Sequence, residues 1–562
     1  MAGNLDYLRQ FLSIERLEKG SWQAFERDVA RLLQHGGFKD VEVIGGSGDG
    51  GADVVAVKGK RKWVVQVKYS EKFEVTMGKD SVHQAFVARE KYKADVCAVA
   101  TNKYFSSDAK EYLEIQKNLG FKAYLWDKDK LLELCASLDA KSKNFRDPRK
   151  YQTKAIEKIY SEIKQGGRNG LLTLATGLGK TIISTSIINK FLEDNPNANI
   201  LVLAHIRELV RQLEKASWTQ FSKNISTHIF TDREKPSSYE GVVFATWQSV
   251  SIALQNGEFA PQQFDLIVVD ECHRAPSKEY SNLIKKMDPS FLLGVTATPW
   301  REDKNSLEEL FGKPLFSMNV VEGMRKGFLA EVDYKMLTDD INWEKVYNLS
   351  TKGYTIKDLN QRLYVPERDI SMVQEIVKTI QETNNPRVLV FCRSIAHAKK
   401  LLGLFKSFDI SSSIIHGKLS RIDRFEALSS FRVGSISVLT SIEMLNEGID
   451  VPDVNIVCFA RVTHSRRIFL QQLGRGLRIS QNKTKVKVLD FVADIRRIAQ
   501  GMEMNNEASK VREEESVFYS NGEIIKFSSD ASSFFDQYLA DMGDISNLDD
   551  NATLEFPPIF KY

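Results

Sequence analysis

Residues 170–181 constrain this chain more than any other stretch. They read GLLTLATGLGKT, an apolar run that predicts a buried strand and then a turn rich in small residues. Residues 182–191 continue with the apolar spacing of a helix. A loop between such a strand and helix binds phosphate, because its backbone N–H groups and the helix N-terminus point at the anion.

We therefore predict an ATP site that includes the loop residues Thr176, Gly177 and Gly179. Lys180 would neutralise the outer phosphate oxygens, and the Thr181 hydroxyl would ligate Mg²⁺. The strict motif has glycine where this chain has Leu174. An ordinary glycine-containing turn in an α/β domain is the alternative for this stretch taken alone.

Composition places the chain among soluble globular proteins of about three or four domains, given 562 residues, 42% hydrophobic and 27% charged. The net charge of +4 is too small to indicate a nucleic-acid partner, so any DNA-binding charge must be local. The five cysteines are far apart and predict reduced thiols in a cytoplasmic protein. We expect neither a secretory signal nor a membrane-spanning segment.

Residues 1–140 predict a metal-dependent nuclease. Ser21 is placed to cap a helix that ends at Gly36-Gly37, and Glu26 falls on the helix's apolar stripe. That stripe is made of Trp22, Phe25, Val29, Leu32 and Leu33. A carboxylate facing a core is costly unless a cation or a donor meets it.

Two strands, residues 52–57 and 63–69, follow a glycine-rich loop and form a hairpin centred near residue 60. Asp53 would then lie opposite residue 67, between the levels of Gln66 and Lys68. Asp53, Glu26 and the Gln66 carbonyl are oxygen ligands suited to Mg²⁺, and Lys68 would orient water or stabilise charge. The alternative is a surface hairpin whose Asp and Lys have no catalytic role.

This region resembles the Mrr-type restriction endonuclease domain over roughly residues 20–135. The resemblance lies in Phe25-Glu26, in GDGGADV at residues 48–54, in VQVK at residues 65–68, and in VHQA and AVATNKYF further on. It implies that Glu26, Asp53, Gln66 and Lys68 form the catalytic constellation. All four positions are intact in this chain.

Residues 141–148 are basic, contain Pro148 and have no helical period, so we interpret them as a linker, either solvated or touching DNA. Beyond it, Gln152 has an amide that could pair with an adenine edge. Residues 264–269 form an apolar run typical of a strand buried on both faces, and Asp270 and Glu271 follow it directly. Asp270 would hold Mg²⁺ through water, and Glu271 would align or deprotonate the attacking water. Another strand ends at Thr296 and Thr298, which could sense the γ-phosphate.

A second α/β unit begins after Pro386, with a strand at residues 388–392. Arg475 and Arg478, three residues apart, share one face at a helix end. They are either arginine fingers that reach the phosphates bound by the first unit or a solvated basic patch.

Residues 149–495 resemble the core of superfamily two helicases and translocases, with two RecA-like domains. The blocks occur in order: Gln152, residues 175–181, 204–209, 246–249, 270–273, 296–298, then 447–450 with 471–478. Within that superfamily, the chain most resembles the motor subunits of type I and type III restriction enzymes, judging by DECHR at residues 270–274 and QQLGRGLR at residues 471–478. The resemblance implies that Gly448 and Asp450 join the nucleotide site. It also implies a track of sequence-independent backbone contacts to nucleic acid. That track would be lined by Arg207, Thr246, Gln248, Arg393, His416 and Thr440.

The predicted fold is α/β throughout. We expect an endonuclease-like domain at residues 1–140, RecA-like domains at 149–335 and 336–500, and an acidic, aromatic segment at 501–562 that is either a partly disordered tail or a docking segment. The leading hypothesis is an ATP-driven DNA translocase fused to a Mg²⁺-dependent endonuclease that restricts foreign DNA, with a possible protein partner for target recognition. A repair or remodelling helicase whose N-terminal domain only binds DNA is one alternative. A sensor that holds nucleotide without turnover is another.

Overall fold

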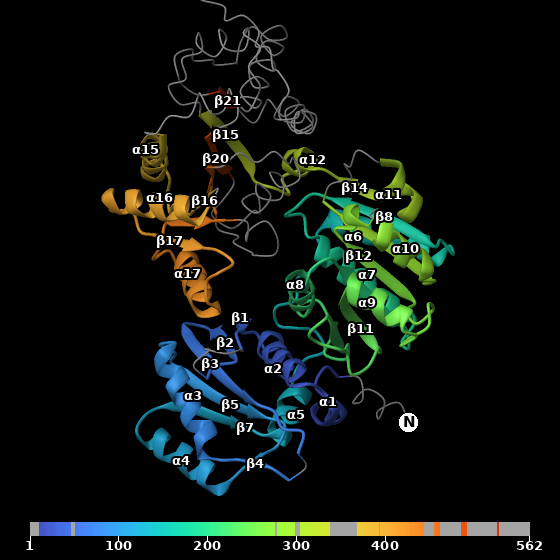
Figure 1. The fold of residues 1–562 in the computed structure, drawn as a ribbon, viewed down its shortest axis with the longest axis vertical. Helices are drawn as coiled ribbons and strands as arrows, with labels where there is room; N and C mark the ends of the chain where they lie inside the picture. Colours follow the sequence, from blue (N-terminus) through green and yellow to red (C-terminus); the bar gives the residue numbers. More distant parts are fainter. Residues whose placement is uncertain are drawn as a thin grey trace, which may run out of the picture. The chain divides into compact units, whose positions relative to one another are not determined.

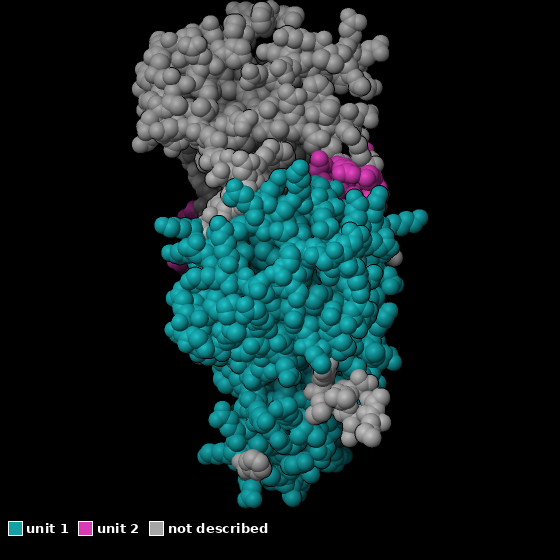
Figure 2. All heavy atoms as spheres, turned by 90° about the vertical axis from the view of Figure 1, so that its right-hand side faces the viewer, with its two compact units in different colours: residues 1–174, 179–317 teal, residues 175–178, 318–562 magenta. Residues whose placement is uncertain are grey.

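The computed structural model describes residues 10–45, 51–72, 74–275, 278–297, 304–337, 368–392, 394–442, 454–460, 485–491 and 525–527. Their strands form three large sheets, one of five strands and two of seven, and a small two-stranded sheet. The chain divides into two compact units (Figure 2). The first holds Met1–Leu174 and Gly179–Ser317, and the second holds Ala175–Leu178 and Met318–Tyr562.

The five-stranded sheet belongs to the N-terminal domain and has the order β1-β2-β3-β5-β7. Its first three strands pair antiparallel, and β3, β5 and β7 are parallel. The strands are β1 (Lys39–Val43), β2 (Val54–Lys58), β3 (Arg61–Lys68), β5 (Val96–Thr101) and β7 (Lys122–Trp126), while β4 (Thr76–Met77) and β6 (Tyr104–Phe105) form the small sheet. The predicted hairpin is therefore present, with Val54 paired to Val65 and Lys58 to Arg61.

Helices cover both faces of this sheet (Figure 1). They are α1 (Ile14–Lys19), α2 (Trp22–His35), α3 (Lys79–Lys91), α4 (Ser107–Asn118) and α5 (Lys128–Ala136). Ser21 caps α2 by accepting a hydrogen bond from the Ala24 N–H at 3.2 Å, as its position in the sequence predicts. Phe25, Val29, Leu32 and Leu33 pack into the core against the strands. The prediction for Trp22 was wrong, because its side chain is 50% exposed at the first position of the helix.

The second sheet lies in the same unit and has the order β10-β11-β9-β12-β13-β8-β14. The six strands from β10 to β8 are parallel neighbours, so apolar runs such as β12 are buried on both faces. The strands are β8 (Asn169–Leu174), β9 (Asn199–Ala204), β10 (Thr227–Phe230), β11 (Gly241–Thr246), β12 (Leu266–Asp270), β13 (Phe291–Thr296) and β14 (Pro314–Met318).

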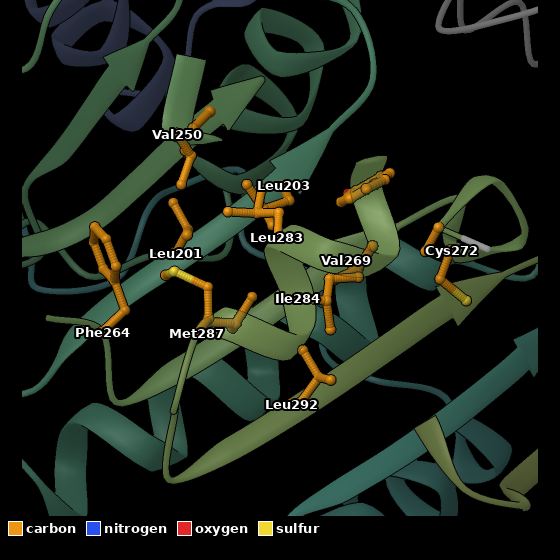
Figure 3. Packing of buried hydrophobic residues seen from close by; sticks show 14 of the residues in the cluster. Leu201, Leu203, Val250, Phe264, Val269, Cys272, Leu283, Ile284, Met287 and Leu292 are labelled. Carbon is orange, nitrogen blue, oxygen red and sulfur yellow. The ribbon is translucent and has the colours of Figure 1, made fainter. Parts of the chain in front are cut away.

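The helices of this domain are α6 (Lys150–Lys164), α7 (Lys180–Asp194), α8 (Arg207–Ser217), α9 (Trp247–Gln255), α10 (Lys278–Lys286) and α11 (Lys304–Phe311). A 3₁₀ turn spans Cys272–Arg274. Figure 3 shows part of the core, where Leu283 and Ile284 of α10 lie among strand residues such as Leu203. Residues 141–148 join the two domains of this unit. This linker is hydrogen-bonded to the endonuclease domain. The Lys143 N–H donates to the His35 carbonyl, and the Asn144 amide donates to the Gln34 and Phe38 carbonyls.

The second unit contains the third sheet, in the order β17-β18-β16-β19-β20-β15-β21. Its strands are parallel except for the pair β15–β21. They are β15 (Glu331–Leu337), β16 (Val388–Cys392), β17 (Ser412–Ile415), β18 (Val438–Ser441), β19 (Ile456–Ala460), β20 (Lys485–Phe491) and β21 (Ile525–Phe527). The helices are α12 (Val320–Arg325), α15 (Arg368–Gln381), α16 (Ile395–Ser407) and α17 (Arg421–Val433). Because β15 begins at Glu331, this sheet starts before the expected boundary at residue 336, and β21 adds part of the C-terminal segment to it.

The expected α/β class with parallel sheets is confirmed. All five cysteines are buried and none forms a disulfide, which agrees with the prediction of reduced thiols. Within the described ranges, no helix has both the length and the apolar character needed to cross a membrane. Most of the C-terminal segment, residues 501–524 and 528–562, lies outside the described residues.

Candidate active sites

The first candidate site lies at the start of β2, where Asp53 is buried. The Asp53 N–H donates to the Val65 carbonyl at 3.0 Å. Its carboxylate Oδ2 accepts from the Val67 N–H at 2.6 Å and from the Gln66 amide at 3.2 Å. Asp53 thus lies beside residue 67 and next to Gln66, as the hairpin predicts.

Gln66 supplies an oxygen that nothing in the described part of the chain satisfies. Its side chain is only 5% exposed, and its amide nitrogen is used by Asp53. The Oε1 atom has no hydrogen-bond partner and lies 3.0 Å from where a Cβ on Gly51 would be. A buried acceptor without a donor is costly, so this oxygen marks a place for a cation or a donor. The sequence assigned this role to the Gln66 backbone carbonyl, whereas the structure points to its side chain.

Glu26 enters from α2 and lies against Gly45, which also contacts the backbone of Asp53. The two carboxylate oxygens of Glu26 lie 2.7 and 2.8 Å from the position that a Cβ on Gly45 would occupy. The Gly45 N–H in turn donates to the Asp53 carbonyl at 3.3 Å. Only glycine leaves room for this approach. Lys68 ends β3 on the same strand face as Gln66 and is half-buried.

These residues fit a magnesium site made of carboxylate and amide oxygens, the ligand type that Mg²⁺ prefers. Among the described residues, no group of three or more His, Cys, Asp or Glu side chains could hold a metal ion. The candidate set instead combines Asp53 and Glu26 with the unsatisfied Oε1 of Gln66. Residues 46–50 of the glycine-rich loop lie outside the described residues.

Asn102 supports this site, although sequence reasoning gave it no role. Its buried amide donates to the Leu17 carbonyl at 2.9 Å and to the Ser70 carbonyl at 3.0 Å, and its oxygen accepts from the Ser70 N–H at 3.0 Å. It therefore ties the end of β5 to α1 and to the segment after β3. An asparagine directly after a buried strand was the only available signal.

The second candidate site lies where β8 gives way to α7. Gly177 and Gly179 have φ angles of +91° and +83°, which favour glycine, and α7 begins at Lys180. The Lys180 ammonium pairs with the Glu271 carboxylate at 3.1 Å. This contact joins the predicted phosphate-binding lysine to the predicted catalytic acid, although the two residues are 91 positions apart.

Glu271 is held in a strained, largely buried position directly after β12, with φ of +48°. Its second oxygen lies 3.2 Å from His273 Nδ1, and the same nitrogen lies 2.9 Å from the buried Thr296 hydroxyl. Burial opposes ionisation, but Lys180 and His273 outweigh it and hold the pKa of Glu271 well below its usual range. An ionised carboxylate here can accept a proton or orient a water molecule. Thr296 therefore reaches the site through His273, while Thr298 lies outside the described residues.

Asp270 and Thr181 lie at the positions expected of magnesium ligands in a nucleotide site. Asp270 is the last residue of β12, Thr181 lies in the first turn of α7, and both are half-buried. Because β12 and β8 are parallel strands of one sheet, their carboxyl ends lie at the same edge.

Gln152, which the sequence predicts to pair with adenine, makes two local contacts in the structure. Its side-chain oxygen accepts the Arg149 N–H at 2.8 Å, which caps the start of α6. Its amide nitrogen lies 2.4 Å from where a Cβ on Gly179 would be. The side chain is buried, so in this structure it buttresses the phosphate-binding loop.

Three residues expected to contact nucleic acid lie together. Arg207, Thr246 and Gln248 line a pocket of about 530 Å³, which we call the strand pocket. Arg207 pairs with Asp232 at 3.2 Å, and the Thr246 hydroxyl lies 2.9 Å from that of Ser249. The pocket is also lined by His205, Ile206, Glu208, Phe230, Thr231, Asp232, Lys235, Ser249, Ile252, Ala253, Asn256 and Glu258.

In the second unit the structure places two of the expected residues. His416 follows β17, and its Nδ1 accepts the Lys418 N–H at 3.2 Å. Thr440 is fully buried in β18 and its hydroxyl donates to the Ser413 carbonyl, so its side chain offers no surface to a nucleic-acid strand. Five other predicted site residues lie outside the described residues, namely Arg393, Gly448, Asp450, Arg475 and Arg478.

Comparison with known families gives three matches along the chain. The family described as restriction endonuclease, the Mrr catalytic domain, matches residues 17–135. The type III restriction enzyme res subunit matches residues 146–301, and the helicase conserved C-terminal domain matches residues 370–480. The chain joins an Mrr-type endonuclease domain to a superfamily 2 helicase core. The resemblance inferred from the sequence is confirmed in both parts.

Individual relatives match the helicase core. The putative ATP-dependent helicase IRC3 of Saccharomyces cerevisiae is 25% identical over 61% of this chain and 51% of its own length. The type I restriction enzyme EcoAI endonuclease subunit of Escherichia coli is 26% identical over 62% of this chain and 46% of its own. The chain thus spans about half the length of these two curated relatives.

One solved structure matches almost the whole chain. It is the ATP-dependent type ISP restriction-modification enzyme LlaBIII bound to DNA, with a TM-score of 0.54 and 18% identity. The match covers 95% of this chain and 42% of that one. It indicates a shared fold for the combination of endonuclease domain and helicase core.

Proposed function

We propose that this protein is an ATP-driven DNA translocase coupled to a Mg²⁺-dependent DNA endonuclease, and that it acts in restriction of foreign DNA. The observation that carries the proposal is the presence of two candidate sites in one chain. One has Lys180 paired with Glu271. The other has Asp53 hydrogen-bonded to Gln66, and Glu26 lying against Gly45.

In the helicase core, Lys180 and the loop N–H groups would bind the phosphates of ATP. Glu271 would orient the attacking water, with His273 holding its carboxylate in place. Movement of the core along DNA would use backbone contacts in the strand pocket, which explains why we expect no sequence preference there. The names of the type I and type ISP relatives support a role in restriction.

In the endonuclease domain, Asp53, Glu26 and the Gln66 side chain would hold Mg²⁺. The ion, when bound, would polarise the phosphodiester and activate water. Lys68 would orient that water or stabilise the charge that develops on the phosphate. Target recognition is proposed to come from a protein partner or from a feature of the DNA itself.

Two substitutions in the full chain separate the activities. Lys180→Ala is expected to abolish DNA-stimulated ATP hydrolysis, because the phosphates lose their cation. Asp53→Ala is expected to preserve ATP hydrolysis and abolish Mg²⁺-dependent cleavage of plasmid DNA. The readouts are phosphate release and conversion of supercoiled plasmid to nicked and linear forms.

The same assay distinguishes the proposal from a helicase whose N-terminal domain only binds DNA. That alternative requires wild-type protein to hydrolyse ATP without cutting modified or unmodified plasmid and phage DNA. Equal cleavage by Asp53→Ala and wild type would remove the endonuclease assignment.

A further inference from the structure

Helix α2 is buried on two sides, and only one side belongs to its own domain. Phe25, Val29 and Leu33 face the endonuclease sheet. Arg27, Asp28 and Arg31, which a surface helix would direct to water, are each less than 10% exposed. Asp28 pairs with Arg16 of α1. The partners of Arg27 and Arg31 lie in the first helicase domain, the domain built on the second sheet.

Arg27 is enclosed by two acids from that domain. Its Nε lies 2.9 Å from Glu214 of α8, and its Nη2 lies 2.7 Å from Glu234. The Nη1 atom donates to the other oxygen of Glu234 at 2.8 Å, so Glu234 holds the guanidinium with both oxygens. Burial alone would lower the pKa of Arg27, but the two acids reverse this and raise it above its usual value.

Further contacts fix the same interface. Arg31 donates to the Ser222 carbonyl at 3.1 Å, and Arg16 donates to the Thr227 carbonyl at 2.7 Å. Trp218, which follows α8, packs into the core cluster of the endonuclease domain. The endonuclease domain is therefore docked on the first helicase domain through α2.

Glu234 also belongs to a short loop that reaches the strand pocket. Its N–H and carbonyl pair with Thr231 at 3.3 and 2.8 Å, which closes residues 231–234 into a tight turn. Thr231, Asp232 and Lys235 line the strand pocket, and Asp232 pairs there with Arg207. One turn of chain thus contacts the pocket through Asp232 and the endonuclease helix through Glu234.

We propose that this turn couples occupancy of the strand pocket by DNA to the position of Glu26, with Arg27 as a positioning residue. An anionic strand that binds Arg207 competes with Asp232 and moves the turn. Glu234 moves with it, and Arg27 follows because its guanidinium is gripped at both oxygens of Glu234. Glu26 precedes Arg27 on a rigid helix, so its carboxylate shifts beside Gly45 and Asp53. The inference rests on the proposed endonuclease function.

The test uses the full chain with Glu234→Gln, which keeps the side-chain shape and removes the charge. We expect plasmid cleavage to fall by about 10–100-fold, as is typical when a residue supporting a metal ligand is changed. We also expect the Mg²⁺ concentration for half-maximal cleavage to rise, while DNA-stimulated ATP hydrolysis is retained. A change in the Mg²⁺ requirement of one activity alone is a result that general destabilisation does not give.

Lys215→Gln is the matched control. Lys215 of α8 pairs with Glu42 of β1 at 2.6 Å, so it also joins the two domains, but this pair is more exposed and does not involve α2. Cleavage and its Mg²⁺ requirement are expected to match wild type. Equal cleavage by Glu234→Gln and Lys215→Gln, with wild type active, overturns the coupling and leaves the proposed function intact. Absence of cleavage by wild type instead counts against the proposed function.

A second measurement, which does not use Glu234→Gln, covers the case in which that variant does not fold. Amide hydrogen exchange in α2 is compared with and without a single-stranded DNA oligonucleotide, in wild type and in Arg207→Gln. The coupling predicts a change in α2 exchange in wild type that is lost in Arg207→Gln. No change in wild type, or the same change in both proteins, overturns it.

Discussion

At the scale of single residues, Gly45 limits where the Glu26 carboxylate can lie. Both carboxylate oxygens lie within 2.8 Å of the missing Cβ position, far inside a normal contact. The clashing atoms are the flexible end of a side chain, so a methyl group here would move the carboxylate and leave the backbone in place. Function is therefore expected to respond more than stability.

We predict that Gly45→Ala lowers plasmid cleavage by about 10–100-fold, because Glu26 is displaced from Asp53. The free energy of unfolding should change by less than about 1 kcal/mol. Gly403→Ala is the control, since a Cβ on Gly403 meets nothing within 4 Å. Full cleavage by Gly45→Ala would show that Glu26 has no role at this position.

Glu271 gives a second prediction at this scale, because its carboxylate is ionised and faces Lys180. Glu271→Gln should lower the rate constant of ATP hydrolysis by about 10²–10⁴-fold through loss of the acceptor for a proton. ATP binding should be retained or tightened, because the charge of Lys180 is no longer neutralised by the acid. Nucleotide titration and steady-state phosphate release measure the two effects separately, and an unchanged rate constant would exclude Glu271 as the catalytic acid-base residue.

At the scale of elements, the sequence predicted what depends on local pattern. The hairpin of β2 and β3, the cap at Ser21, and the strands β12 and β16 follow from alternation, capping residues and apolar runs, and the structure contains all of them. Asp53, Gln66 and Glu26 could be brought together in advance because turn geometry and a helix stripe place them. The same apolar spacing wrongly predicted that Trp22 lies in the core.

The burial of Arg27, Asp28 and Arg31 could not be predicted from the helix alone. A charged face opposite an apolar stripe is the pattern of a surface helix, and only the partner shows otherwise. The partners of Arg27, Glu214 and Glu234, lie about 200 residues further along, as the separation of 207 positions between Arg27 and Glu234 illustrates. The capping role of Gln152 was missed for a related reason. Its side chain could bond either an adenine edge or the nearby Arg149 N–H, and the sequence does not show which partner is preferred.

Trp218 tests the interface as a structural element. Its side chain is 2% exposed and packs into the endonuclease core from the end of α8. Trp218→Ala should reduce the free energy of unfolding by about 3–5 kcal/mol, as is usual when a large buried aromatic side chain is removed. Trp22→Ala, at a half-exposed tryptophan, should cost far less. Similar losses in urea unfolding for the two variants would contradict this assignment.

Strand β10 makes the same interface sensitive to pH through His228. Burial, together with the nearby charges of Arg16 and Arg27, lowers the pKa of His228 well below 6.5. Below about pH 6.5, His228 binds a proton in the unfolded chain but not in the folded protein. The free energy of unfolding should therefore fall as the pH decreases from about 6.5. Urea unfolding of wild type and His228→Gln at pH 5 to 8 measures this, and the variant should show a smaller loss. Parallel curves would exclude His228 as a contributor.

At the scale of the molecule, the endonuclease domain and the first helicase domain form one compact unit. Cutting the chain at residue 140 would expose the arginines of α2 and the pocket for Trp218. It would also expose the Ala136 and Leu138 carbonyls, at and beyond the end of α5, which accept hydrogen bonds from Lys223. The endonuclease domain and the first helicase domain are therefore parts of one compact unit and not two independent bodies.

We predict that a fragment of residues 1–317 unfolds in one cooperative transition, whereas residues 1–140 alone are much less stable or aggregate. Removing one partner of a buried ion pair typically costs about 3–5 kcal/mol, which is a large share of the stability of a small domain. Thermal unfolding followed by circular dichroism compares the fragments. An equally stable 1–140 fragment would show that the interface contributes little.

The two-sided burial of α2 also bears on attempts to build chimeric nucleases. If residues 17–135 were fused to an unrelated helicase core, Arg27 would lose both of its acidic partners, because Glu214 and Glu234 belong to the first helicase domain. A successful graft must carry the acids, or replace Arg27 with an apolar side chain that fits the new host. The segment that must be transferred as one piece is therefore larger than the catalytic domain defined by the family match at residues 17–135.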